Sequence, residues 1–185
     1  MPRLLVLNHH GASVPALIKT LNETGATLKI IEASEVRPSS AAGFDGVVAS
    51  GGYLRSEAYR EELGVYSQML DDLDRPFLGV CLGLKILGHH YGARMRKIEP
   101  AVGMHHVRFL REYPLAAGIR ECDVYQGHKY ELIPPLPEAM ENYAANGSPV
   151  QAVKISGLER FGVQFHPELS GEPAVGIVRS FVSLC

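Results

Sequence analysis

Short apolar runs alternate with helically spaced apolar positions in the first half of the chain. The runs cover residues 3–7, 27–31, 46–49 and 77–80. Apolar residues recur at helical spacing in two of the intervening segments, at Val14, Leu17, Ile18 and Leu21 and across residues 57–73. Strands that are apolar throughout and alternate with amphipathic helices are typical of a parallel sheet covered on both faces. The pattern predicts a three-layer, flavodoxin-like α/β fold with a mainly parallel sheet.

The pattern changes in the second half. From Arg94 to about Ile155, short strand-like pieces such as residues 105–110 are interrupted by proline and glycine. We expect this stretch to add antiparallel strands and loops. We expect residues 161–164 to form another strand and residues 174–184 a closing helix. The 185 residues, 46% of them hydrophobic, fit a single domain spanning residues 1–185.

Composition excludes several classes of function. The formal net charge of -2 gives no overall field that would attract nucleic acid or an anionic membrane. No apolar run is long enough to span a bilayer, so the sequence predicts a soluble, cytoplasmic protein. The three cysteines are widely separated and lack CxxC spacing, which argues against disulfides and a metal site. A small-molecule substrate or a protein partner fits better.

Cys81 lies between two glycines in the string GVCLG, where a buried strand meets a helix. This is the pattern of a nucleophile elbow, in which a sharp turn strains the central residue and small neighbours prevent collisions. The following helix N-terminus favours the thiolate, and its N–H groups can stabilise an oxyanion, with the amide of Leu82 as the first candidate. A buried structural cysteine is the alternative, and it is our interpretation of Cys122 and Cys185.

A cysteine nucleophile needs a histidine that moves its proton and a third group that orients the histidine. His166 belongs to the string VQFHPE, at the C-terminal end of a predicted strand where active sites of open α/β sheets gather. Glu168 is close enough to bind one imidazole nitrogen. The adjacent histidine pairs at residues 9–10, 89–90 and 105–106 are interpreted as solvated or loop residues. A structural role for His166 is the alternative.

The string SGG ends the run at residues 46–49, and its glycines can expose backbone N–H groups to a ligand. Alone it is only a turn. In the order SGG, GVCLG and VQFHPE, the motifs resemble the class I (triad) glutamine amidotransferase family across nearly the whole chain. The resemblance implies a glutaminase with a triad of Cys81, His166 and Glu168, and an oxyanion hole formed by the amide of Gly51 or Gly52 together with that of Leu82.

Within the family, the short length and the string GHKYE at residues 127–131 are most similar to the separate glutaminase subunit of GMP synthase. This implies that glutamine is hydrolysed and that the ammonia passes to an ATP-dependent synthetase subunit, expected to be GMP synthetase, which aminates XMP. ATP and Mg would belong to that partner, and this chain would need no cofactor. Residues expected near the substrate are Lys85, Gly127 and His128.

Several positions depart from the family pattern. Lys85 replaces a glutamine that helps to hold the substrate, and lysine offers a charged donor and no acceptor. Gly127, Tyr130 and Tyr53 replace a usual serine, aspartate and proline. Three explanations remain open: glutamine is held differently, Lys85 pairs with a carboxylate of another γ-glutamyl substrate in a hydrolase that acts alone, or catalysis has weakened in a regulatory module.

Overall fold

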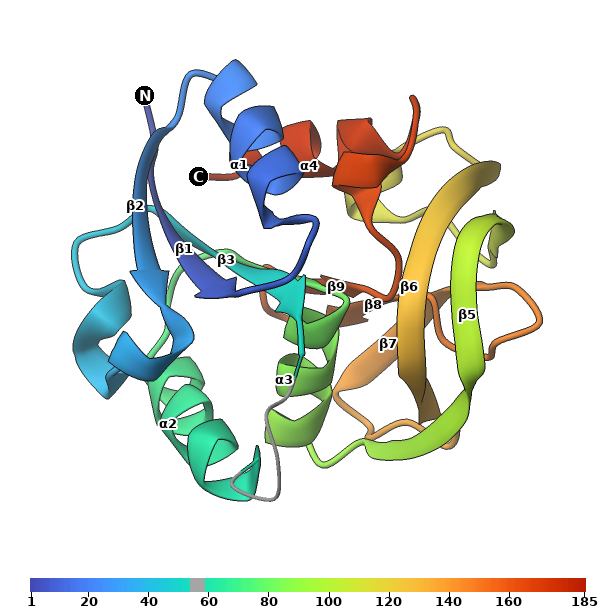
Figure 1. The fold of residues 1–185 in the computed structure, drawn as a ribbon, viewed down its shortest axis with the longest axis horizontal. Helices are drawn as coiled ribbons and strands as arrows, with labels where there is room; N and C mark the ends of the chain where they lie inside the picture. The colour runs from blue at the N-terminus through green and yellow to red at the C-terminus, as the bar shows by residue number, and fades with distance from the viewer. Residues whose placement is uncertain (54–58) are drawn as a thin grey trace.

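One mixed sheet organises the protein. In the computed structural model, which describes residues 1–53 and 59–185, nine strands pair in the order β2-β1-β3-β4-β9-β8-β7-β5-β6 (Figure 1). The strands are β1 (Arg3–His9), β2 (Thr27–Glu32), β3 (Gly46–Gly52), β4 (Phe77–Val80), β5 (Arg94–Phe109), β6 (Glu121–Ile133), β7 (Met140–Ala145), β8 (Ala152–Ile155) and β9 (Arg160–Val163). The helices are α1 (Val14–Glu23), α2 (Tyr59–Asp71), α3 (Leu82–His90) and α4 (Val175–Val182). Short 3-10 helices are η1 (Ala33–Glu35), η2 (Pro38–Ala41), η3 (Pro114–Ala116) and η4 (Pro167–Leu169).

The parallel half of the sheet is covered on both faces. β2, β1, β3, β4 and β9 run parallel, with α1 and α4 on one face and α2 and α3 on the other (Figure 1). Alternate residues of β1 therefore enter different cores. Leu4 packs with α1 and α4, whereas Leu5 packs with α2 and α3. The predicted three-layer α/β fold is confirmed.

The edge strand β2 is less buried than the sequence predicts. The apolar pattern predicts a strand buried on both faces, but several of its residues, including Lys29 and Ile30, are exposed. β2 pairs only with β1 among the described strands, and short helices rather than a full layer flank it (Figure 1). Position at the sheet edge, which periodicity does not encode, explains the difference.

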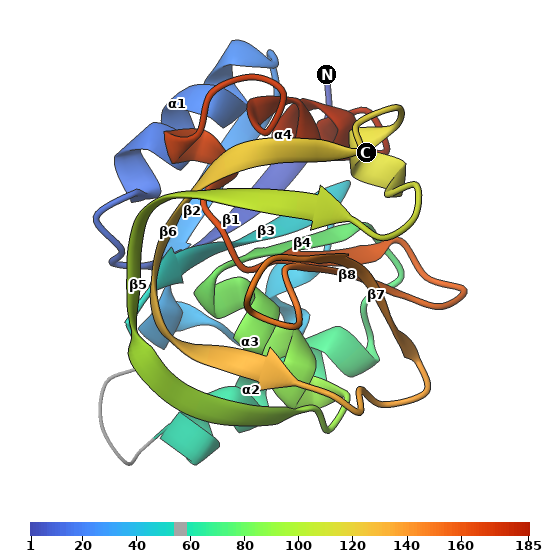
Figure 2. The same cartoon turned by 90° about the vertical axis from the view of Figure 1, so that its right-hand side faces the viewer.

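The second half is more regular than the sequence pattern predicts. Instead of short pieces and loops, β5 and β6 are strands of 16 and 13 residues that pair antiparallel and curve around one side of the molecule (Figure 2). The register shifts between Lys97 and Ala101, at the position of Pro100. A bulge admits proline because the proline nitrogen cannot donate to the ladder. The prediction of antiparallel strands is confirmed, and that of irregular structure is wrong.

Two predicted helices are also present. α2 accounts for most of residues 57–73, although residues 57 and 58 lie outside the described part of the chain. α4 forms the closing helix, and its buried face includes Ile177 and Phe181. Of the helices described, none is long and apolar enough to cross a membrane.

Candidate active site

Cys81 forms a strained turn between β4 and α3. Its φ of 50° and ψ of -90° lie in a region that residues with a side chain rarely adopt. A Cβ on Gly79 would lie 2.4 Å from the carbonyl carbon of Gly83, and one on Gly83 would lie 2.4 Å from the oxygen of Ala49. Both positions therefore require glycine, because no side chain fits between these backbones. The predicted elbow is confirmed.

His166 follows β9 and faces the elbow. Its backbone is fixed by two hydrogen bonds, from its N–H to the oxygen of Tyr125 (2.8 Å) and from Ser170 Oγ to its own carbonyl oxygen (2.7 Å). Nδ1 lies 2.9 Å from Oε1 of Glu168, a buried residue of η4. Nε2 is therefore the ring nitrogen left for Cys81, and the charge of His166 is one of the causes that lower the pKa of the Cys81 thiol. The structure joins His166 to Glu168 by a hydrogen bond and places Cys81 within electrostatic reach of the imidazole.

The charges of the site favour an ion pair. Burial alone would raise the pKa of the Cys81 thiol, but the charge of Lys85 and the hydrogen bond to His166 outweigh it, and the pKa is lowered. Burial alone would lower the pKa of His166, yet its hydrogen bonds to Cys81 and Glu168 raise it to about 9. A thiolate next to an imidazolium is the state from which cysteine nucleophiles attack carbonyl groups.

Gly51 and Gly52 at the end of β3 form a glycine loop that packs directly against His166. A Cβ on Gly51 would lie 2.5 Å from Cε1 of His166, and one on Gly52 would lie 2.2 Å from the carbonyl oxygen of His9. Glycine is required at both positions because the loop touches the imidazole on one side and β1 on the other. The loop thus lies against the imidazole of His166, and Gly52 also lines the cavity that contains Cys81 and Leu82.

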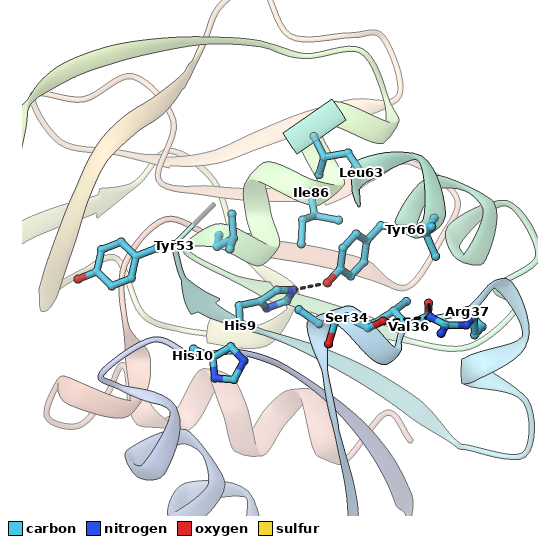
Figure 3. Close-up of a pocket in the computed structure, with 12 residues that line it drawn as sticks. His9, His10, Ser34, Val36, Arg37, Tyr53, Leu63, Tyr66 and Ile86 are labelled. Carbon is cyan, nitrogen blue, oxygen red and sulfur yellow. Dashed lines mark hydrogen bonds between the residues drawn. The ribbon is translucent and has the colours of Figure 1, made fainter. Parts of the chain in front are cut away.

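His9 fixes the glycine loop, and the interpretation of this residue as solvated is wrong. Its ring is buried, Nδ1 donates to the oxygen of Ser50 (3.1 Å), and Nε2 accepts from the hydroxyl of Tyr66 (2.9 Å; Figure 3). Burial lowers the pKa of His9 to about 4, so the ring is neutral, as this pattern of donor and acceptor requires. His9 therefore connects the loop to α2 at the wall of a neighbouring cavity of about 310 Å³.

A cavity of about 360 Å³ opens above the thiol. Its walls come from the glycine loop, the elbow and the β5–β6 pair, and its lining comprises Gly52, Tyr53, Cys81, Leu82, Lys85, Pro100, Val102, Tyr125, Gly127, His128, Lys129 and Tyr130. The residues expected near the substrate, Lys85, Gly127 and His128, are all among them. His128 is held by Gln126 Oε1 (2.7 Å) and the oxygen of Tyr130 (3.1 Å), and burial lowers its pKa to about 4.

Sequence reasoning missed two residues of the site. Ser13, in the loop before α1, places Oγ 3.1 Å from Nδ1 of His166 and is buried. Gln164, between β9 and His166, directs Nε2 toward the sulfur of Cys81 at 3.8 Å. Ser13 has no local signal, since serine before a helix usually suggests only a cap. Gln164 could have been noticed because it is polar within an apolar run.

Comparison with known proteins agrees with this geometry. The family model for class-I glutamine amidotransferases matches residues 5–183. The chain belongs to this family. One relative of this amidotransferase, the glutamine-hydrolyzing subunit of GMP synthase from Thermoplasma acidophilum, is 28% identical over 189 residues, and the match covers 100% of this chain and 94% of the relative. The imidazole glycerol phosphate synthase subunit HisH of a Synechococcus strain is 27% identical, over 97% of this chain and 93% of its own.

The solved structures lead to the same family. A crystal structure of a protein from Thermoplasma acidophilum, described as a candidate GMP synthase subunit, superimposes with a TM-score of 0.91 at 28% sequence identity. The match covers 100% of this amidotransferase chain and 94% of the other. The fold of this chain is therefore shared over its full length.

Proposed function

We propose that this chain is the glutaminase subunit of a GMP synthase. It would hydrolyse glutamine to glutamate and deliver the ammonia to a separate ATP-dependent synthetase subunit that aminates XMP. The chemistry is supported by the strained elbow that carries Cys81, together with the buried His166 whose imidazole contacts the carboxylate of Glu168 and whose charge lowers the pKa of the Cys81 thiol. The acceptor is proposed from the full-length similarity to a glutamine-hydrolyzing subunit of GMP synthase.

The reaction begins with a thiolate and an imidazolium. The Cys81 sulfur attacks the side-chain amide carbon of glutamine, and the carbonyl oxygen becomes an oxyanion facing the amides of Leu82 and of Gly51 or Gly52. As the C–N bond breaks, His166 donates its proton to the leaving nitrogen, which departs as ammonia. A thioester remains on Cys81.

The second half of the reaction hydrolyses the thioester and restores the site. Neutral His166 removes a proton from water, whose oxygen attacks the thioester carbonyl. Glutamate leaves, and the thiolate and imidazolium form again. Glu168 keeps Nδ1 of His166 as a donor throughout, so Nε2 always faces the sulfur.

Polar as well as apolar residues line the cavity that contains the Cys81 thiol. Gly127 and His128 form the wall opposite the elbow, and the oxygen of Gly127 lies 4.0 Å from the Cys81 sulfur. We assign these two residues to substrate binding. No nucleotide site is assigned to this chain: ATP and Mg are allotted to the synthetase partner, which would dock over the mouth of the cavity.

A glutaminase assay of the purified chain tests the proposal. Glutamate release is measured first with the chain by itself and then with a GMP synthetase subunit, ATP, Mg²⁺ and XMP. We expect hydrolysis that depends on Cys81 and increases when the partner and nucleotides are present. Hydrolysis of a γ-glutamyl peptide but not of glutamine, without any partner, would replace the proposal with a hydrolase that acts alone. An inactive chain that still binds the synthetase would indicate a regulatory module.

A further inference from the structure

Lys85 directs its ammonium toward the nucleophile. It lies one helical turn after Cys81 on α3, and helical side chains lean toward the N-terminus, which brings it under the elbow. Nζ lies 3.1 Å from the oxygen of Cys81, 3.1 Å from Oε1 of Gln164 and 3.9 Å from the Cys81 sulfur. An ammonium has three donors, and these three atoms account for them.

Lys85 is buried, and burial lowers the pKa of its ammonium below the ordinary value for lysine. The Cys81 thiolate and the carboxylate of Glu131 act in the opposite direction and offset part of this effect. The other titratable groups that face the sulfur or the ammonium are His166, Glu168 and His128. Burial lowers the pKa of His128 to about 4. Lys85 and His166 are the two basic groups that lower the pKa of the Cys81 thiol.

We propose that Lys85 is a built-in counter-ion that holds Cys81 in its thiolate form, rather than a ligand for a substrate carboxylate. The glutamine usual in the family at this position can donate hydrogen bonds but carries no charge. The second cation stabilises negative charge on sulfur in addition to His166, so thiolate persists to lower pH. The role deepens the proposed function because the same thiolate would attack glutamine.

Alkylation of Cys81 measures this role without any assumption about the substrate. The rate of reaction with iodoacetamide, a neutral reagent, is followed by mass spectrometry at Cys81 as a function of pH. Burial raises the pKa of Cys122 to about 11 and that of Cys185 to about 12, so these thiols react little below pH 9. The midpoint of the curve reports the ionisation of Cys81.

We expect Lys85→Gln to raise this midpoint by about 1 to 3 pH units, which is the usual effect of an opposite charge within a few ångströms. Below the midpoint the alkylation rate should fall about tenfold per unit. Lys97→Gln makes the same chemical change on exposed β5 and should leave the midpoint where it is. An unchanged midpoint in Lys85→Gln would overturn the proposal.

A stability cycle provides a second test that needs no reactive thiol. Thermal unfolding at pH 8 is compared for the wild type, Lys85→Gln, Cys81→Ala and the double variant. If the two groups form an ion pair, Lys85→Gln should lower the Tm more in the wild type than in the Cys81→Ala background. Equal changes in both backgrounds would overturn the proposal. If Lys85→Gln shifts the midpoint but the wild type hydrolyses no glutamine, the proposed function would be refuted. The role of Lys85 as a counter-ion of Cys81 would still be supported.

Discussion

Replacing Gly51 by alanine should disable the site while leaving the fold intact. The added methyl group would point at the imidazole of His166, with Cβ 2.5 Å from Cε1 and 3.3 Å from Nδ1. It would therefore collide with the ring that links Cys81 to Glu168. Either the ring or the glycine loop has to move.

The size of the effect follows from this overlap. Ordinary contacts of a Cβ begin at 3.4 Å, so the ring or the loop must retreat by about 1 Å, a misplacement that can cost about 100-fold in rate. This corresponds to about 2.7 kcal/mol of transition-state stabilisation. The loss should appear in kcat as well as in kcat/KM, since the collision affects the proton carrier rather than the substrate pocket.

Glutamate release by the chain together with its synthetase partner is the assay. Gly64→Ala is the matched control, because a Cβ at this position in α2 meets no atom of the described residues within 4 Å beyond the backbone of its own helix. It should keep wild-type activity and is expected to raise the unfolding free energy by up to about 1 kcal/mol. Thermal unfolding of both variants separates a damaged site from a damaged fold.

A folded Gly51→Ala protein with wild-type kcat would refute the reasoning, because it would show that the loop does not pack against a working His166. Unfolding of the variant at room temperature would contradict the prediction that the collision is confined to the site.

Four further predictions concern the site and the residues that support it. A glutamine-analogue electrophile should label Cys81 and spare Cys122 and Cys185, which peptide mapping can check; labelling of all three thiols would contradict the assignment. In the wild type, kcat/KM should decline as pH rises through about 9, because His166, whose pKa is about 9, then lacks the proton for the leaving ammonia. Glu168→Gln should move this decline to lower pH and reduce kcat by about 100-fold or more, and an unshifted pH profile would count against Glu168 as the orienting group. Tyr66→Phe removes the donor to His9 and should lower the unfolding free energy by about 1–2 kcal/mol without moving that profile.

The sequence determined the features that are local in the chain. Strands and helices of the first half could be predicted because burial on one or both faces imposes a period on neighbouring residues. The elbow at Cys81 could be predicted because its steric requirement falls on Gly79 and Gly83, two positions away on either side. The pairing of His166 with Glu168 spans only two residues, so it too could be inferred from one short string.

Tertiary structure decided the features that join distant segments. Ser13 meets His166 across 153 positions, and His9 meets Ser50 across 41, so no local pattern records either contact. The length of β5 depended on a bulge at Pro100 that only pairing with β6 reveals. The same holds for Lys85: its identity was evident in the sequence, but the direction of its ammonium depends on burial against Gln164, 79 positions away. Charge and hydrogen bonding act through space, and only the folded chain specifies which groups lie within their reach.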